Sequence, residues 1–379
     1  MKVQQVEDKK NLKYLRSPDE KDRLFPKNKK VEIVFLVEAV NAILPRTEGV
    51  EDITLMKLAG TDYEVPVILP EKLQAVTRRK MLAQLRKYKD LKTEELGKHL
   101  ERLVNVENVV IKDKKGNIKE KRPVSFVKAR KYVSDPKSWN CFIQPSGGET
   151  REKATDIGMD GFCPACVLFG AVLDKTHIEI IRRDKKGETN VFGEAVGIKS
   201  RVEFDPAFAI SDQAVSVASY THNKVADGVS WTGQSLFTEQ HVVAGTIFVG
   251  RVVLEDVTET ELKAFLAVLS AIDRLGGRER VFGTVRIHLL GIKGGSYETV
   301  SAYELARELA KEYGERLLSI DEVKEKLKPK LEKLGFETIS EDDYKKLLDN
   351  MELWDKLWEE TTEFDRQVIR RILDILGAT

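Results

Sequence analysis

The chain has 379 residues, and its 41% hydrophobic content is enough for a large core or for two to three domains. Its three cysteines are too few for the disulfide framework of a small secreted protein. The first residues are polar, without a signal-peptide core, and no apolar run approaches the ~20 residues of a membrane span. We therefore expect a soluble, cytoplasmic protein without a membrane partner.

Charge is unevenly distributed, although the net charge is only +1. Residues 111–137 hold ten Lys or Arg and three acids, whereas residues 337–379 hold twelve acids and six bases. A basic middle region is typical of a surface that meets a polyanion.

The first predicted elements are an arm, a strand and a helix. Residues 1–30 are polar and basic, which predicts an N-terminal arm that orders on assembly. The β-branched run at 31–44 predicts a long strand. The run at 70–89 begins at a proline and predicts a helix with an apolar stripe and a basic opposite face.

Regular patterns become sparse after this helix and then return. Residues 109–127 predict a hairpin, and 128–190 have poor periodicity. Strands are predicted at 197–205, 245–257 and 280–292. Before the last of these strands, Thr258 and Glu261 match a capping box that opens a helix ending at Leu275.

Without its long excursions, the chain reads strand, helix, strand, strand, helix, strand. This is the ferredoxin-like order of an RNA-recognition motif (RRM). We predict an α+β protein with an RRM-like core over 31–295, large insertions and an α-helical C-terminal extension over 300–379. The insertions are a zinc-stabilised lid at 100–190 and a thumb loop at 212–242. Because this fold hosts many functions, it does not decide the activity.

Two cysteines lie close together in the irregular stretch. Cys163 and Cys166 form a C-x-x-C pair, and Cys141 lies upstream. Three thiolates and one imidazole are a common set of structural zinc ligands, and such a metal can replace a missing apolar core. The alternatives are three ordinary buried cysteines or a redox pair, although no thioredoxin-like strand precedes it.

The fourth zinc ligand is open between two histidines. His99 lies on the apolar stripe of a predicted helix, whereas His177 is closer to the pair in sequence but lies in a charged segment. We favour His99.

An ordered set of segments resembles one protein family. The segments are "CPACVLFG", "GIKSRVEFDPAFAI", the loop "SVASYTHNKVADGVSWTGQSLFTEQHVVAGTIFVG" and "LGGRERVFGTVRI". Over about residues 30–295 the chain resembles the backbone subunits of class 1 CRISPR effector complexes, in the RAMP superfamily. It is most similar to the type I-D backbone subunit.

The resemblance implies a protein that binds single-stranded guide CRISPR RNA. Copies would polymerise along the guide and contact other subunits of the effector complex. Such binding uses a basic groove that follows phosphates, without sequence specificity. The paired stacking aromatics of RRM strands are absent, which favours a groove made by loops and helices.

Three segments suit RNA binding. They are a glycine-rich loop, a basic helix face and the thumb loop. Each also has a plainer interpretation: the loop as a helix cap, the helix face as a solvated surface, and the tryptophan of the thumb loop as a core residue. The candidate residues are Gly276, Gly277, Arg278 and Arg280 in the first, Arg78, Arg79 and Lys80 in the second, and His222, Asn223, Lys224 and Trp231 in the third.

Two other functions compete. Type III backbone subunits cut target RNA with a loop aspartate, and here the loop after the first strand offers Glu48, Glu51, Asp52 and Asp62. A zinc-stabilised adapter that binds no nucleic acid is the third reading. We expect no enzymatic activity, because a closed zinc site cannot activate water and the histidines are scattered.

Overall fold

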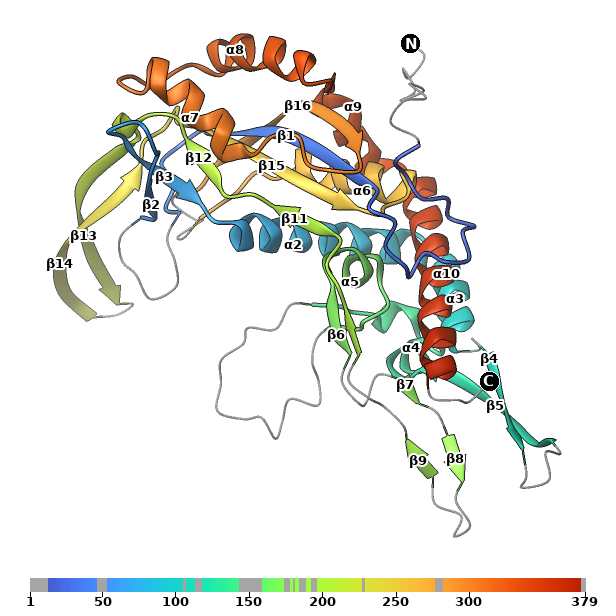
Figure 1. Ribbon diagram of the computed structural model, residues 1–379. Coiled ribbons are helices and arrows are strands. Elements are labelled where there is room, and N and C mark those ends of the chain that lie inside the picture. Colours follow the sequence, from blue (N-terminus) through green and yellow to red (C-terminus); the bar gives the residue numbers. More distant parts are fainter. Residues whose placement is uncertain are drawn as a thin grey trace.

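A mixed α+β architecture is seen in the computed structural model of the protein (Figure 1). Its largest sheet has eight strands within the described residues and follows the order β17-β16-β1-β15-β12-β3-β2, with β11 also paired to β15. The structure describes residues 13–45, 53–104, 107–112, 118–142, 159–173, 178–179, 181–183, 189–191, 196–226, 229–276 and 282–375.

The central strand is β1 (Lys30–Ala39), which pairs with β15 (Ile247–Glu255) and β16 (Val285–Gly295). Both pairings are antiparallel, as are those of β15 with β11 (Val202–Phe204) and β12 (Ala207–Ala209). β1 is buried along almost its whole length because helices cover both faces of the sheet.

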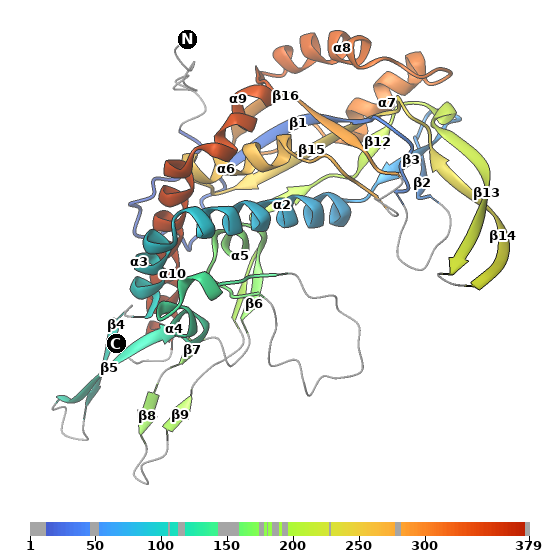
Figure 2. The ribbon, with the colours of Figure 1, turned by 180° about the vertical axis from the view of Figure 1, so that it is seen from behind.

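Helices α2 (Pro70–Leu91) and α6 (Glu259–Ser270) cover one face of the sheet, and α7 (Ala302–Tyr313) and α8 (Ile320–Lys333) cover the other (Figures 1 and 2). Successive side chains of β1 point alternately towards these two helical layers.

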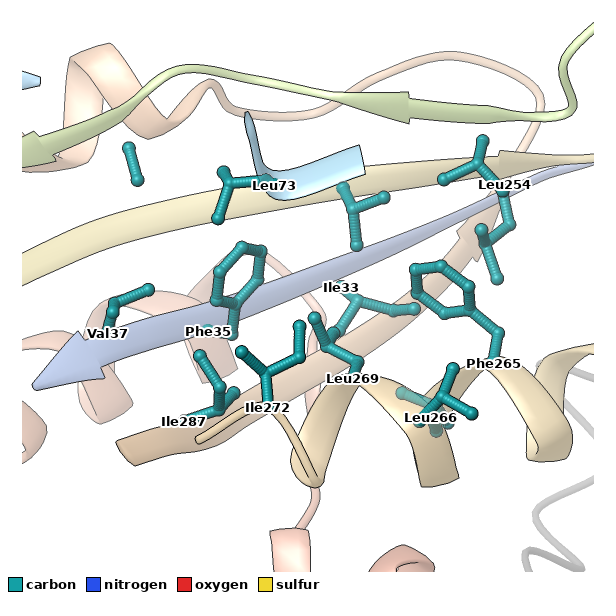
Figure 3. Packing of buried hydrophobic residues seen from close by; sticks show 14 of the residues in the cluster. Ile33, Phe35, Val37, Leu73, Leu254, Phe265, Leu266, Leu269, Ile272 and Ile287 are labelled. Atoms are coloured by element: carbon teal, nitrogen blue, oxygen red, sulfur yellow. The ribbon is translucent and has the colours of Figure 1, made fainter. Parts of the chain in front are cut away.

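The side of β1 that faces α6 is apolar. Ile33, Phe35 and Val37 point towards the helix, whose Phe265 and Leu269 face them in Figure 3. All five side chains are completely buried.

The opposite face of the sheet holds a buried charge cluster. Arg251 of β15 donates to Glu32 of β1 at 3.1 Å and to Asp205 at 2.8 Å. Asp205 also accepts from the backbone N–H of Ala302, so the cluster joins α7 to the sheet.

The other elements lie at the sheet edges, between the core strands and at the C-terminal end. Their bounds are β2 (Leu55–Lys57), β3 (Glu64–Ile68), α3 (Thr93–Val104), β4 (Glu107–Lys112), β5 (Ile118–Phe126), α4 (Val127–Val133), α5 (Pro164–Phe169), β6 (Ala171–Leu173), β7 (Ile178–Glu179), β8 (Ile181–Arg183), β9 (Thr189–Val191), β10 (Val196–Ile198), β13 (Val215–Ala226), β14 (Val229–Val242), β17 (Glu337–Thr338), α9 (Glu341–Lys345) and α10 (Met351–Ile375); short 3-10 turns are η1 (Pro136–Ser138), η3 (Asp212–Ala214) and η4 (Lys346–Asp349).

Several elements differ from the sequence-based predictions. The predicted thumb loop is a long antiparallel hairpin, β13 and β14, which projects from one end of the sheet (Figure 1). The strand predicted at 197–205 is broken into β10 and β11. The capping box at Thr258 and Glu261 is present, but its helix ends at Ser270 rather than Leu275.

The two chain ends pack on the sheet domain where the structure describes them. In the described part of the expected N-terminal arm, Leu15, Arg16 and Arg23 are buried, so the arm is anchored to the fold at these positions. The C-terminal helices contribute Trp354 and Trp358 to the same apolar cluster as the sheet. The predicted extension therefore shares the core.

No helix in the described part of the chain combines the length and the apolar character needed to cross a bilayer.

Candidate metal centre and nucleic-acid interface

The three cysteines converge on one buried cluster with Asp160. One ligand atom from each of these four side chains lies within 4.8 Å of the other three, and all four residues are buried. The Sγ atoms of Cys141 and Cys166 are 3.7 Å apart. A tetrahedral zinc with Zn–S bonds of about 2.3 Å holds its sulfurs about 3.8 Å apart, whereas a disulfide needs about 2 Å.

Asp160 closes the turn that carries the C-x-x-C pair. One carboxylate oxygen accepts from the backbone N–H groups of Phe162 and Cys163, and the other accepts from Trp139 Nε1 at 2.8 Å. Burial, together with the negative charge of Cys166, raises the pKa of Asp160 to about 7 despite these bonds. Asp160 thus joins the segment of Cys141 to the segment of Cys163.

The helix α2 supports the cluster with two arginines. Arg78 contacts Met159 Sδ at 3.0 Å and Cys166 Sγ at 3.5 Å. Arg86 donates to the carbonyl oxygen of Cys141 at 2.7 Å. Hydrogen bonds from the other two thiols lower the pKa of Cys166, and the Arg78 charge lowers it further. Arg78, expected on an RNA-facing surface, instead lies against the cysteines.

The favoured fourth ligand, His99, is not part of this cluster. Its Nε2 lies 3.0 Å from Asp355 Oδ1, an atom that also accepts from Tyr88. The ring stacks on Trp358. This is a correction: His99 is held by α10, and the fourth member among the described residues is Asp160. The alternative, His177, lies outside the described residues.

The donor set suits a borderline-soft dication. Three sulfurs and one carboxylate oxygen at these separations match the ligand types and the geometry of a structural zinc site. None of the three cysteines forms a disulfide. A tetrahedral ion held by all four groups would have no position left for a reacting water.

A second site lies where the chain leaves β1. A cavity of about 160 Å³ is lined there by Leu44, Pro45, Val76 and Leu275, among other residues. Lys72 and Arg79 of α2 line it too, and Arg79 is exposed. An apolar floor with cationic groups at its rim can take a nucleotide base and its phosphates.

The glycine-rich loop begins at this cavity. Gly276 has a φ of +99°, and a Cβ there would lie 2.9 Å from the carbonyl oxygen of Leu44. The absence of a side chain at Gly276 therefore lets its backbone lie against the backbone of Leu44. Leu275 donates to the carbonyl oxygen of Gly283 at 2.8 Å, which fixes both ends of the loop beside the cavity.

Three of the predicted RNA-binding residues lie in the loop itself. Gly277, Arg278 and Arg280 are outside the described residues. On the neighbouring helix, Lys80 lies 3.5 Å from Asp273 in an ion pair that joins α2 to the chain after α6.

The β13–β14 hairpin is also rooted at the cavity. Val242 at its base exchanges two backbone hydrogen bonds with Ile43. His241 stacks on Phe282, which links the hairpin to the far side of the glycine-rich loop. The residues of the thumb loop that were predicted to bind RNA lie on the two strands of the hairpin: His222, Asn223 and Lys224 on β13 and Trp231 on β14.

Sequence reasoning missed Asp160 and Lys72. Asp160 precedes Cys163 by three residues, a spacing at which a carboxylate can accept from the backbone of the turn. That spacing was the available signal. No local sequence signal marked Lys72, because only the fold brings this lysine next to Leu44 and Gly276.

Comparison with known proteins assigns the family. The sequence model described as Csc2 Crispr matches residues 13–369. The chain belongs to the Csc2 family of CRISPR proteins. The crystal structure of Thermofilum pendens Csc2 is 36% identical, with a TM-score of 0.67, and the match covers 97% of this chain and 96% of that one.

More distant structures are also similar to this Csc2 family chain. A chain of a "CRISPR RNA-guided surveillance complex, pre-nicking" is 11% identical with a TM-score of 0.42, over 81% of this chain and 89% of that one. A chain of a "CRISPR RNA-guided surveillance complex" is 10% identical with a TM-score of 0.39, over 80% and 84%. No curated protein matches the sequence.

Proposed function

We propose that this Csc2 protein is an RNA-binding backbone subunit of a type I-D CRISPR effector complex. It binds guide CRISPR RNA through a basic groove without sequence specificity, and further copies of the chain and other subunits assemble along the same RNA. Its core is RRM-like, with the strand order β16-β1-β15-β11/β12 and helices α2 and α6 on one face.

One observation carries the RNA-binding proposal. Three segments that the sequence suggested separately meet at residues 43–45: the basic helix α2, the glycine-rich loop and the hairpin. A groove made by loops and a helix also agrees with the lack of stacking aromatics on the central strands. Phosphates would contact Lys72, Arg79 and the loop arginines, while base pairing would read the target.

Zinc is the proposed cofactor, and its role is structural. The cysteines and Asp160 would hold the ion, which supplies a fixed link between the segments of Cys141 and Cys163. Elemental analysis of native protein, purified without chelators, should give one zinc per chain. A zinc-free protein would refute this assignment.

We further propose that the chain has no nuclease activity. Among the described residues, the cysteine cluster is the one group of three or more potential metal ligands. Of the loop acids, Asp62 is exposed, whereas Glu48, Glu51 and Asp52 lie outside the described residues. Regular cleavage of guide-paired RNA in magnesium, abolished by Asp52→Ala or Asp62→Ala, would favour the type III-like alternative.

Salt dependence of RNA binding tests the groove. The dissociation constant of a single-stranded RNA is measured over a range of salt for wild type and for Lys72→Ala/Arg79→Ala. Each lost phosphate contact makes the plot of the log association constant against log salt less steep by about 0.7. The slope of the double variant should therefore be smaller in magnitude by about 1.4. Two RNAs of different sequence should give the same constants.

Lys328→Ala/Lys333→Ala is the charge-matched control, because both lysines are exposed on α8 or its C-terminal end. It should leave the slope near that of wild type. Equal losses in the two double variants would show that net charge, and not this groove, governs the binding.

A further inference from the structure

The proposed zinc centre carries a charge that its own ligands do not balance. Three thiolates and one carboxylate bring four negative charges, so a dication held by the three cysteines and Asp160 leaves a net charge of −2. All four residues are buried, and a buried charge is strongly unfavourable unless another group pairs with it. A cation in contact with one of the ligands would therefore strengthen the binding of the metal.

Arg78 of α2 supplies such a cation. Its Nη2 atom lies 3.5 Å from Cys166 Sγ and 3.0 Å from Met159 Sδ. The thioether of Met159 is neutral, so Cys166 is the ionisable partner of the two. Arg78 Nε is buried and has no hydrogen-bond partner among the described residues. The guanidinium thus keeps an unsatisfied donor next to a site that would hold excess negative charge.

The second arginine that α2 places at the cluster has a different role. Arg86 donates to Asn140 Oδ1 at 3.1 Å and to the carbonyl oxygen of Cys141 at 2.7 Å, and both acceptors are neutral. These bonds position the backbone of Cys141. The contact between a guanidinium and a ligand sulfur is made by Arg78.

The residue that follows Arg78 faces another site. Arg79 is exposed and lines the cavity of about 160 Å³ beside residues 43–45, together with Lys72. Successive side chains of an α-helix point in directions about 100° apart, so two adjacent arginines can serve two different sites.

We propose that α2 divides its basic residues between two ligands: Arg78 balances the charge of the metal centre, and Arg79 contacts RNA. The inference rests on the zinc centre and the groove of the proposed function. Arg78 acts through Cys166 and binds no metal itself, so it is a positioning residue around the inner ligands.

Zinc affinity tests the first half of this division. It is measured by competition with a chromophoric chelator for wild type, Arg78→Met and Arg79→Met. Methionine keeps an apolar stem but removes the charge and the N–H donors. Loss of a group that supports a metal ligand typically weakens metal binding about 10- to 100-fold, and we expect this loss in Arg78→Met alone. Equal zinc affinity of Arg78→Met and wild type would overturn the inference and leave the metal centre intact, whereas wild type without zinc affinity would overturn both.

The salt dependence of RNA binding tests the second half, with the same two variants at saturating zinc. Arg79→Met should make the plot of the log association constant against log salt less steep by about 0.7, and Arg78→Met should leave it unchanged. A less steep plot for Arg78→Met, or an unchanged one for Arg79→Met, would overturn the division. Wild type that binds zinc but no RNA would overturn the groove together with this half.

Arg78→Lys separates charge from packing, and it is also the milder variant if Arg78→Met does not fold. Lysine keeps the positive charge, so Arg78→Lys should bind zinc more tightly than Arg78→Met. Equal weakening in both would show that charge is not the cause.

Cobalt(II) in place of zinc gives a spectroscopic test of the contact with Cys166. An N–H···S bond stabilises the sulfur electrons, so its loss in Arg78→Met should move the sulfur-to-cobalt charge-transfer band to longer wavelength. The band reports on metal-loaded protein alone, and Arg79→Met should leave it in place. An unshifted band in Arg78→Met would contradict the contact between Arg78 and the metal ligand.

Discussion

The sheet with α6 and the segment with the cysteines are stabilised in different ways. Between β1 and α6, many large apolar side chains are completely buried, and the helix begins at a complete capping box. Around Cys163, the chain is fixed by a few specific contacts: one carboxylate, two arginines and three sulfurs.

This difference determines how each region responds to change. An apolar core distributes its free energy over many contacts, so the loss of one side chain costs a part of the total. A metal cluster concentrates its free energy in four ligands and one ion, so the loss of any one of them affects the whole segment. The predictions below test this contrast.

The largest expected effect is that of removing the proposed zinc. Structural zinc contributes about 10 kcal/mol or more to the folding of the segment that holds it. Chelation should therefore speed amide exchange strongly in residues 159–170 and leave α6 and β15 protected. Mass-spectrometric exchange with and without zinc measures both regions together. Equal loss of protection in both would show that the sheet depends on the segment that carries the cysteines.

The same contrast explains which features the sequence reveals. Apolar periodicity and the Thr258–Glu261 capping box predicted β1, α2 and α6 because these patterns are local. The cysteines were visible as potential ligands, but Asp160 was not singled out and His99 was chosen in its place. His99 lies on an apolar stripe because Trp358 and Asp355 of α10 pack there, a long-range contact that local patterns do not contain.

Truncation of Phe265 should be the next largest effect. Phe265 is completely buried between α6 and the sheet, and Phe→Ala changes in such cores cost about 3–5 kcal/mol. Urea denaturation measures the loss, with Lys263→Ala, a half-buried lysine on the same helix whose ammonium pairs with exposed Glu259, as the control. The variant should keep one zinc per chain. Loss of zinc at urea concentrations at which the variant is still folded would contradict the independence of the sheet core and the cysteine segment.

Acid should weaken the buried ion pairs at the start of α6. Burial alone would raise the pKa of Glu261, but the charges of Arg201 and Arg23 outweigh it and lower the pKa to about 2. Because the folded-state pKa lies below the ordinary value of about 4.5, the pair stabilises the protein above pH ~5 and loses this effect as the pH falls towards 2. The shift corresponds to about 3 kcal/mol.

Glu261→Gln tests this pH dependence. The difference in unfolding free energy between wild type and the variant should be large at pH 7 and should narrow as the pH falls from about 5 to about 2. Glu259→Gln, an exposed acid in the same helical turn, serves as the control. A difference that stays constant with pH would mean that Glu261 is not ionised in the folded protein.

The smallest expected effect is that of the cap itself. Thr258 Oγ1 accepts from the backbone N–H of Glu261 at 3.2 Å and donates to Glu360 at 2.6 Å. Loss of an N-cap hydroxyl costs about 0.5–2 kcal/mol, so Thr258→Ala should lower the free energy of unfolding by an amount in this range. Thr258→Ser keeps the oxygen and should lose less. Because the hydroxyl joins α6 to α10, an effect in Thr258→Ala well above this range would show that the contact with Glu360 contributes more than the cap.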